Sequence, residues 1–148
     1  MKDKLKEYQE LIISWAKDKN ITGAECIPMQ RLKLIEEVGE IASAIVKNKR
    51  EEYIDGIGDS FVVLTILAEQ NNEVFEIDLQ RTGDYAALDL SELISSIIYH
   101  EIFVDFEVFL EVCDKLEVDI LDCVSSAWNE IKDRKGKTSG GVFIKNED

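Results

Sequence analysis

The chain has 148 residues, with 17 Lys and Arg against 31 Asp and Glu, so its formal net charge is −14. That balance argues against a nucleic-acid-binding surface, because phosphate backbones are held by clustered Lys and Arg. Hydrophobic residues make up 45% of the chain and charged residues 32%, which is typical of a folded domain and not of a disordered acidic tail. We therefore predict one compact domain over residues 1–148.

The first half of the sequence favours long helices, since Pro28 is the single proline in the chain. Apolar residues recur three and four positions apart over residues 4–19, which predicts an amphipathic helix, and residues 20–26 are expected to form a loop. A second helix is predicted from Pro28 to about residue 47. Its predicted buried face consists of apolar residues at helical spacing: Leu32, Ile35, Val38, Ile41, Ala42 and Ile45.

A third helix is predicted over about residues 51–70. Its apolar run at 61–68 is also compatible with a buried strand, but the length of the segment and its polar start favour a central buried helix. Residues 71–88 show no regular pattern and are expected to cross the surface as a loop, with a turn at 82–84.

Three helical signals follow that loop. Asp89 and Glu92 have the spacing of a capping box that opens a helix. Aromatic residues recur at helical spacing over 102–116, and Asp119 is predicted to cap the last helix. We therefore predict an all-α fold, a compact bundle of five to six helices with a four-helix core.

The cysteines indicate a reducing compartment. Cys26, Cys113 and Cys123 form no CxxC pair, and Cys113 and Cys123 fit small core positions. The first residues lack the apolar core of a signal peptide, and no run of about 18 apolar residues occurs. We expect a cytoplasmic protein that does not bind a membrane.

Carboxylates crowd one sector of the second predicted helix. At about 100° per residue, Glu36, Glu37 and Glu40 lie beside its apolar stripe; a solvated acidic face is the simplest explanation. Asp55 and Asp59, however, lie one turn apart directly before the most hydrophobic stretch, where an ionised carboxylate is costly unless it is paired or bound to a cation. An antiparallel helix pair would bring these five residues together as an all-oxygen cluster suited to Mg²⁺ or Mn²⁺.

Glycines and cations accompany this cluster. Three glycines lie at the carboxylate level and are explained equally well by close helix contact or by room for a ligand: Gly39, Gly56 and Gly58. Lys132, Arg134 and Lys135 follow the last helix, where cations complement the helix dipole or hold phosphate oxygens. We predict that residues 132–148 form a mobile cationic tail. A metal cluster with such a tail suits phosphate-ester hydrolysis by water, with Glu36 orienting or deprotonating that water.

The motif Glu36-Glu37-x-x-Glu40, followed by a second acidic helix that ends in Gly58-Asp59, resembles the MazG-like family of all-α nucleotide pyrophosphohydrolases. The run 127–143 resembles the end of the compact phage-type and bacterial members. The resemblance implies cleavage of a (d)NTP between the α and β phosphates, which yields (d)NMP and pyrophosphate. It also implies a Mg²⁺ cofactor, for which Mn²⁺ is a possible substitute, and assembly as a homodimer or homotetramer.

Residue roles carry over from the resemblance position by position. Glu37, Glu40 and Asp59 match the metal ligands, and Glu36 matches the adjacent acid that is assigned to a second metal or to water activation. Phosphate contacts are expected from four cations: Lys33, Lys132, Arg134 and Lys135. Trp128 and Asn129 match positions near the nucleotide, although core packing explains Trp128 equally.

One departure from the family pattern concerns the second acidic motif. The family has Glu three residues before the final Asp, and this chain has Gly56 there. Asp55 is the first candidate to replace that ligand and Glu52 the second. The departure keeps an alternative open, a non-catalytic helical module that binds a nucleotide or a protein and whose acidic cluster only holds cations.

Other catalytic classes find no support in the sequence. His100 is the single histidine and lies far from both acidic motifs, so an ordinary surface residue is expected there. Zinc is not expected without Cys or His clusters. No glycine-rich phosphate loop or GxGxxG motif occurs, which argues against P-loop and dinucleotide-binding folds.

Overall fold

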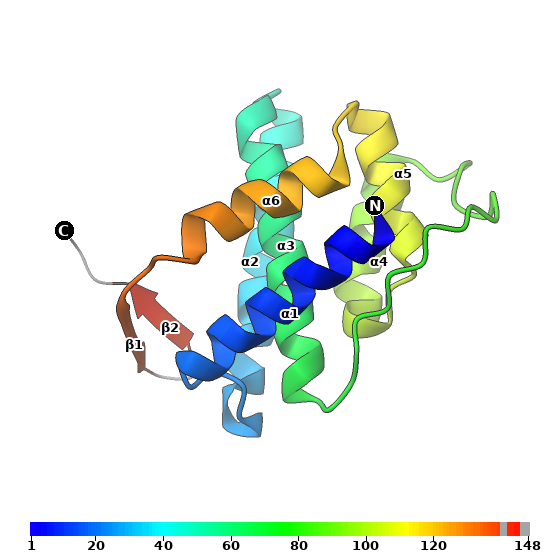
Figure 1. The fold of residues 1–148 in the computed structure, drawn as a ribbon. Coiled ribbons are helices and arrows are strands. Elements are labelled where there is room, and N and C mark those ends of the chain that lie inside the picture. The colour runs from blue at the N-terminus through cyan, green and yellow to red at the C-terminus, as the bar shows by residue number, and fades with distance from the viewer. Residues whose placement is uncertain (140–141, 146–148) are drawn as a thin grey trace.

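The computed structural model describes residues 1–139 and 142–145. In this part of the chain, six α-helices and a β-hairpin follow one another (Figure 1). The helices are α1 (Lys2–Asp18), α2 (Ile27–Val46), α3 (Arg50–Gln70), α4 (Leu90–His100), α5 (Phe106–Leu116) and α6 (Ile120–Ile131). Two short 3-10 turns, η1 (Ala24–Cys26) and η2 (Glu101–Phe103), precede α2 and follow α4. The predicted all-α bundle is confirmed.

The centre of the molecule is α3, which packs against α1, α2 and α6. Every residue from 60 to 68 is buried, so this segment is the central helix that its length predicted and not a strand. Phe61 lies edge-on to Phe75 and Phe106, and Phe75 lies edge-on to Phe109. Helices α4 and α5 pack together beside this core (Figure 1).

Two glycines let α3 approach its neighbours closely. A Cβ at Gly56 would lie 2.7 Å from Cγ1 of Ile41 on α2, and a Cβ at Gly58 would clash with the carbonyl oxygen of Cys123 on α6. Of the two explanations left open for these glycines, the structure supports close helix contact. Gly39 differs, because a Cβ there would meet nothing within 4 Å.

The buried face of α2 differs from the predicted one. Val38 and Ile41 are buried as expected, but Leu32 and Ile35 are 56% and 49% exposed, and Ala42 is also exposed. The buried positions are instead Gln30, Leu34, Glu37, Val38, Ile41 and Ala44. Because α2 carries apolar residues on more than one side, helical periodicity alone does not decide which side faces the core.

The predicted helix starts are confirmed. Asp89 accepts a hydrogen bond from the backbone N–H of Glu92, whose side chain accepts one from the Asp89 N–H, and this completes the capping box of α4. The Asp119 side chain accepts a bond from the backbone N–H of Asp122 at the start of α6. These short-range polar patterns are visible in sequence because each is closed within four residues.

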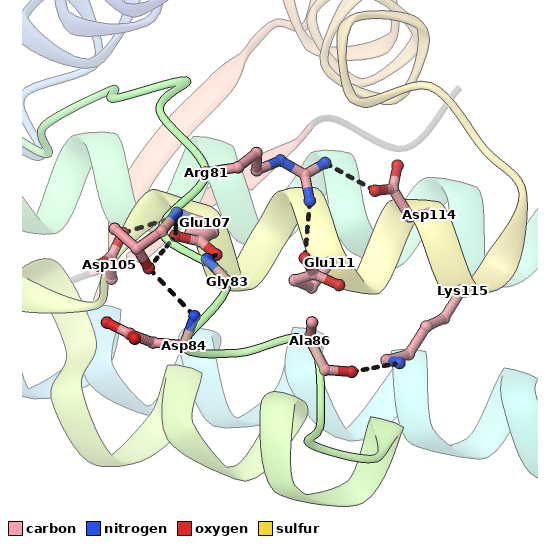
Figure 2. Close-up of polar contacts among 10 residues, drawn as sticks. Arg81, Gly83, Asp84, Ala86, Asp105, Glu107, Glu111, Asp114 and Lys115 are labelled. Carbon is pink, nitrogen blue, oxygen red and sulfur yellow. Dashed lines mark hydrogen bonds and ion pairs between the residues drawn. The ribbon is translucent and has the colours of Figure 1, made fainter.

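The segment between α3 and α4 is irregular, as predicted, and it is held on α5 by ionic contacts (Figure 2). Glu107 is fully buried and accepts bonds from the N–H of Thr82, the hydroxyl of Thr82 and the N–H of Gly83, at 2.8, 2.8 and 3.2 Å. Arg81 pairs with Glu111 and Asp114 at 2.8 and 2.7 Å.

The chain ends in a hairpin that the sequence analysis did not predict. Strand β1 (Gly136–Ser139) pairs antiparallel with β2 (Val142–Lys145), with Gly136 opposite Lys145 and Ser139 opposite Val142. Residues 140–141 and 146–148 of the predicted cationic tail lie outside the described residues, and the mobility of the tail stays a prediction. The hairpin lies beside the C-terminal end of α1 (Figure 1).

None of the helices in the described part of the chain combines the length and the apolarity needed to cross a bilayer.

Candidate active site

One pocket of about 290 Å³ gathers most of the residues singled out by the sequence. It runs along α2 and α3 and is closed by the end of α1, the end of α6 and the hairpin. Its polar residues are Gln30, Lys33, Glu36, Glu37, Glu40, Asp59 and Arg134. Its apolar and aromatic residues are Trp15, Ile21, Val62, Val63, Ile66, Ile131 and Phe143.

The pocket has an acidic end and an apolar end because of the way α2 and α3 pair. Gln30, Lys33, Glu37 and Glu40 are three or four positions apart and line one face of α2, over about 15 Å at 1.5 Å per residue. The short turn between Val46 and Arg50 sets α3 antiparallel to α2, and the contact of Gly56 with Ile41 fixes their register, so that Asp59 lies near Glu37 and Glu40. Ile66 then lies toward the Gln30 end.

Glu37 is the buried carboxylate of the acidic end. It is 7% exposed, and its Oε2 atom has no hydrogen-bond partner. Burial, the charge of Asp59 and a hydrogen bond with Glu40 raise the pKa of Glu37 to about 8. The carboxyl group therefore holds a proton near neutral pH when nothing else balances its charge.

Lys33 is the cation beside these carboxylates. Its Nζ lies 2.7 Å from Oε1 of Glu36 and 3.5 Å from Oε1 of Glu37. Burial acts to lower the pKa of Lys33, but the hydrogen bond to Glu36 and the charge of Glu37 outweigh it and raise that pKa. Lys33 thus stays charged at the middle of the α2 face.

Asp59 faces α6 as well as α2. Burial and the charges of Glu130 and Asp55 raise the pKa of Asp59 to about 6, whereas Arg134 acts in the opposite direction. Burial and Glu130 also raise the pKa of Asp55. Glu130 was missed by the sequence analysis. It follows Cys123 and Ala127 at helical spacing, and the contact of these two residues with Gly58 brings it near Asp59. No spacing in the sequence alone indicated that contact.

A second cavity of about 390 Å³ lies on the other side of Glu40 and Asp59. Its lining consists of Glu40, Ser43, Glu52, Asp55, Asp59 and Glu130. Asp55 and Glu52, the two candidates to replace the missing glutamate, therefore line this second cavity and not the main pocket. Position 56 itself is filled by Ile41, so α2 and α3 have closed the space that a longer side chain would need.

The carboxylates of the acidic end fit a hard cation in their chemistry. They offer only oxygen atoms, one of them the buried Oε2 of Glu37 without a partner, and Mg²⁺ and Mn²⁺ prefer oxygen ligands. As the side chains stand, the described residues include no group of three or more His, Cys, Asp or Glu already arranged around a metal position. The oxygen donors are present, but they do not surround one point.

Residues 29–85 match the MazG nucleotide pyrophosphohydrolase domain family. They form a MazG-like segment. The resemblance is thereby confirmed over α2, α3 and the following loop, which supply Glu36, Glu37, Glu40 and Asp59. An uncharacterized 18.2 kDa protein from the rep-hol intergenic region of Haemophilus phage HP1 (strain HP1c1) is 43% identical over 68 residues. That match covers 46% of this chain and 42% of the phage protein, so the chain spans less than half the length of this relative. No solved structure matches the chain.

The predicted cations and nucleotide contacts fall partly inside and partly outside the pocket. Lys33 of the MazG-like segment and Arg134 line the pocket. Lys132 and Lys135 are exposed and do not line it. Trp128 packs against the core and Asn129 is exposed, and neither lines the pocket. His100 is exposed, as expected.

The sequence analysis did not assign the aromatic residues of the pocket or Gln30 to the site, and the two aromatic residues come from outside the MazG-like segment. Trp15 lies near the end of α1, and Phe143 lies on β2 with its ring centroid 5.1 Å from that of Trp15. Gln30 opens the polar face of α2. Its spacing of seven and ten from Glu37 and Glu40 was a usable signal, whereas the pairing of Trp15 with Phe143 depends on the whole fold.

Proposed function

We propose that this protein is a metal-dependent nucleotide pyrophosphohydrolase that cleaves a (d)NTP between its α and β phosphates, giving (d)NMP and pyrophosphate. The observation that carries the proposal is the buried, unpartnered Oε2 of Glu37 beside Glu40 and Asp59, within a MazG-like segment. A carboxylate in that position costs free energy unless a proton or a cation balances it. A divalent cation would supply that counter-charge and could bind a triphosphate at the same time.

The carboxylates divide into ligands and a water-positioning group. Glu37, Glu40 and Asp59 would hold Mg²⁺, or Mn²⁺ in its place, and Asp55 is the further candidate ligand from the second cavity. A metal held there would supply charge neutralisation for the phosphates and Lewis acidity toward water. Glu36, whose side chain is 55% exposed, orients or deprotonates the attacking water.

The cations complete the phosphate site. Lys33 and Arg134 both line the pocket and hold the outer phosphate oxygens. Lys132 and Lys135 are exposed beside Arg134 and would reach the leaving pyrophosphate only if the segment after α6 turned them toward the pocket. Trp128 and Asn129 lie on α6 and do not line the pocket, so their contact with the nucleotide stays a prediction.

A second candidate function is a module that binds a nucleotide without hydrolysing it. Gly56 favours this alternative, because Ile41 fills the space where the family carries a ligand. The two functions share the substrate-binding pocket and differ in turnover.

The deciding experiment measures pyrophosphate and orthophosphate release from a panel of canonical and modified NTPs and dNTPs with Mg²⁺, with Mn²⁺ and with EDTA. Metal-dependent pyrophosphate without orthophosphate is the expected result. Binding of the same nucleotides without any product, by folded protein in excess Mg²⁺, would establish the non-catalytic module instead.

Assembly as a homodimer or homotetramer is part of the proposal. It is supported by large apolar side chains that are exposed to solvent: Leu32 and Ile35 on α2, and Tyr99 and Phe103 on α4 and η2. Helices α2 and α4 are neighbours, and exposed apolar groups of this kind are typical of protein interfaces. Phe106 and Phe109, the next aromatic residues along the chain, are core residues and do not contribute to this surface.

The assembly is tested by light scattering of the purified protein and of the variants Leu32→Asp and Val74→Asp. Wild type and Val74→Asp are expected to be oligomers, since Val74 is exposed on the loop after α3. Leu32→Asp is expected to be a monomer, because a charge at the interface centre is left without a partner. A monomeric wild type would contradict this part of the proposal.

The free, buried state of Cys26, Cys113 and Cys123 supports a cytoplasmic location, where thiols stay reduced.

A further inference from the structure

We infer that the acidic end of the pocket holds a single divalent cation and that the ammonium group of Lys33 takes the place of a second one. The inference rests on the proposed function, since it concerns how many metal ions that site takes. It goes further by assigning Lys33 to the carboxylates as well as to the substrate phosphates. The site then carries one permanent cation within its own chain.

The first observation is that Lys33 bridges two consecutive carboxylates. Its Nζ lies 2.7 Å from Oε1 of Glu36 and 3.5 Å from Oε1 of Glu37. The Glu37 side chain is 10% exposed, so one of the two contacts is with a buried group. A cation between two carboxylate oxygens at these distances balances their charge as a bridging metal ion would.

Two other Lys–Glu pairs on helices show what an ordinary surface contact looks like. Lys4–Glu7 and Lys49–Glu52 have the same spacing of three residues, at 3.2 and 3.6 Å, and both partners of each pair are more than half exposed. Exposed pairs of this kind contribute little to stability. Lys33 differs because it meets two carboxylates, one of them buried, inside a pocket.

The second observation is that the two oxygens of Glu37 have different surroundings. Oε1 faces Lys33, whereas Oε2 is out of contact with water and has no hydrogen-bond partner. A buried carboxylate oxygen without a partner has lost its bonds to water, which is costly. Oε2 is therefore the atom left for a metal ion, next to Glu40 and Asp59.

The third observation is that the ligands for a second metal ion are missing or engaged. Position 56 is a glycine, and a Cβ there would lie 2.7 Å from Cγ1 of Ile41. Asp55 lines the second cavity and not the main pocket. Glu36, the remaining acid on this side, is paired with Lys33. The main pocket therefore offers a metal ion one position, and Lys33 already balances the carboxylates of the other.

A lysine in this place differs from a metal ion in its chemistry. It carries one charge and provides no Lewis acidity, so it stabilises the ionised forms of Glu36 and Glu37 without activating water. Its ammonium group has three N–H donors. Lys33 can therefore keep its contact with Glu36 while another N–H donates to a phosphate oxygen, which makes the two roles of Lys33 compatible.

The test counts the Mn²⁺ ions bound to the full chain without nucleotide, from the EPR signal of free Mn²⁺ during a titration. Salt at about 0.15 M screens exposed charges beyond about 8 Å, which separates a built site from diffuse binding to an acidic surface. Wild type is expected to bind one ion per chain. Asp59→Asn removes a proposed ligand and should weaken that binding at least about tenfold.

The variant Lys33→Gln tests the role of the lysine, because it removes the charge and keeps a polar side chain. It should bind Mn²⁺ at least about fivefold more tightly than wild type, or take up a second ion, since a unit charge that repels a divalent ion is gone. Lys4→Gln is the matched control. It removes the same charge from a Lys–Glu pair of the same spacing on α1 and should bind Mn²⁺ as wild type does.

Two ions of similar affinity in wild type would overturn the inference, and loss of one of them in Asp55→Asn would place that ion in the second cavity. Unchanged Mn²⁺ binding by Lys33→Gln would also overturn it, as would a wild type that binds no Mn²⁺.

These outcomes are separate from those of the proposed reaction. A protein that binds one ion and responds to Lys33→Gln, but releases no pyrophosphate, keeps the inference and loses the enzymatic function. A protein that releases pyrophosphate and binds two ions loses the inference alone.

Discussion

At the scale of single residues, the acidic end of the pocket is governed by unbalanced negative charge. Glu37 and Asp59 both have raised pKa values, and burial is the first cause in each case. The sequence predicted that these two residues and Glu40 meet, because all three lie on helices whose pairing follows from a short turn. Glu130 and Trp15 could not be placed from spacing alone, since their positions depend on how α6 and α1 cross α3.

Stability without metal should fall as pH rises. The pKa of Glu37 in the folded protein is about 8, above its ordinary value of 4.5. Folding therefore favours the protonated carboxyl, a contribution present in full below about pH 4.5 and lost as pH rises to about 8. We expect urea unfolding in EDTA to show a loss on the order of a few kcal/mol between about pH 5 and pH 9.

The variant Glu37→Gln isolates this effect, because it removes the titrating group and keeps its shape. It should lose much less stability over the same pH range than wild type. Glu73→Gln is the control, since Glu73 is exposed and its replacement should leave the pH dependence unchanged. A decline in Glu37→Gln as steep as in wild type would show that Glu37 does not hold the proton.

The two aspartates of α3 should differ in their effect on turnover. Asp59 lines both cavities, whereas Asp55 lines only the second. We expect Asp59→Asn to lower pyrophosphate release at least about a hundredfold, as loss of a metal ligand does. Asp55→Asn should lower pyrophosphate release as strongly only if Asp55 replaces the ligand missing at Gly56. Normal turnover of Asp59→Asn would refute the metal-site assignment.

At the scale of helices, local sequence patterns predicted where helices begin, but periodicity did not predict which side of α2 is buried. The capping residues Asp89 and Asp119 lie where the sequence placed them because their bonds are closed within a few residues. The prediction for the buried side of α2 was wrong at Leu32 and Ile35, which are exposed. Periodicity identifies a helix, but only its neighbours decide between two apolar sides.

Two glycine substitutions should have opposite effects on stability. Gly58→Ala places a methyl group against the Cys123 carbonyl and 2.9 Å from the Ala127 Cβ, so α6 must move away from α3, at a cost of about 1–3 kcal/mol or more. Gly39→Ala meets open space inside α2 and should gain about 0.5–1 kcal/mol from higher helix propensity. Urea unfolding measures both, and a destabilised Gly39→Ala would contradict this description of α2.

The attachment of the 71–89 loop to α5 depends on Glu107. Its pKa is lowered chiefly by the backbone bond from Thr82, which means that the ionised carboxylate holds the loop. In Glu107→Gln an amide group faces the donors of Thr82 and Gly83 (Figure 2), so hydrogen exchange at these two amides should accelerate. Glu73→Gln should leave their exchange unchanged, and protected amides in Glu107→Gln would show that the loop is held elsewhere.

At the scale of the whole molecule, the charge balance of the chain bears on what the pocket can bind. The net charge is −14, yet the pocket carries Lys33 and Arg134 beside its carboxylates. These two cations alone do not balance the carboxylates together with a triphosphate, so the proposed function requires a divalent metal to accompany the triphosphate. The all-α class could be predicted from composition and hydrophobic periodicity. The hairpin that brings Phe143 to Trp15 could not be predicted, because a short pair of strands has little periodic signal.

The most direct test of the central claim is phosphorus NMR of a deoxynucleoside triphosphate incubated with the protein, followed with Mg²⁺ and with EDTA. We predict that Mg²⁺ gives the signals of a monophosphate and pyrophosphate in equal amounts, that no diphosphate nucleotide accumulates, and that EDTA stops the reaction. Formation of a nucleoside diphosphate with orthophosphate, or an unchanged triphosphate in the presence of folded protein and excess Mg²⁺, would contradict the account.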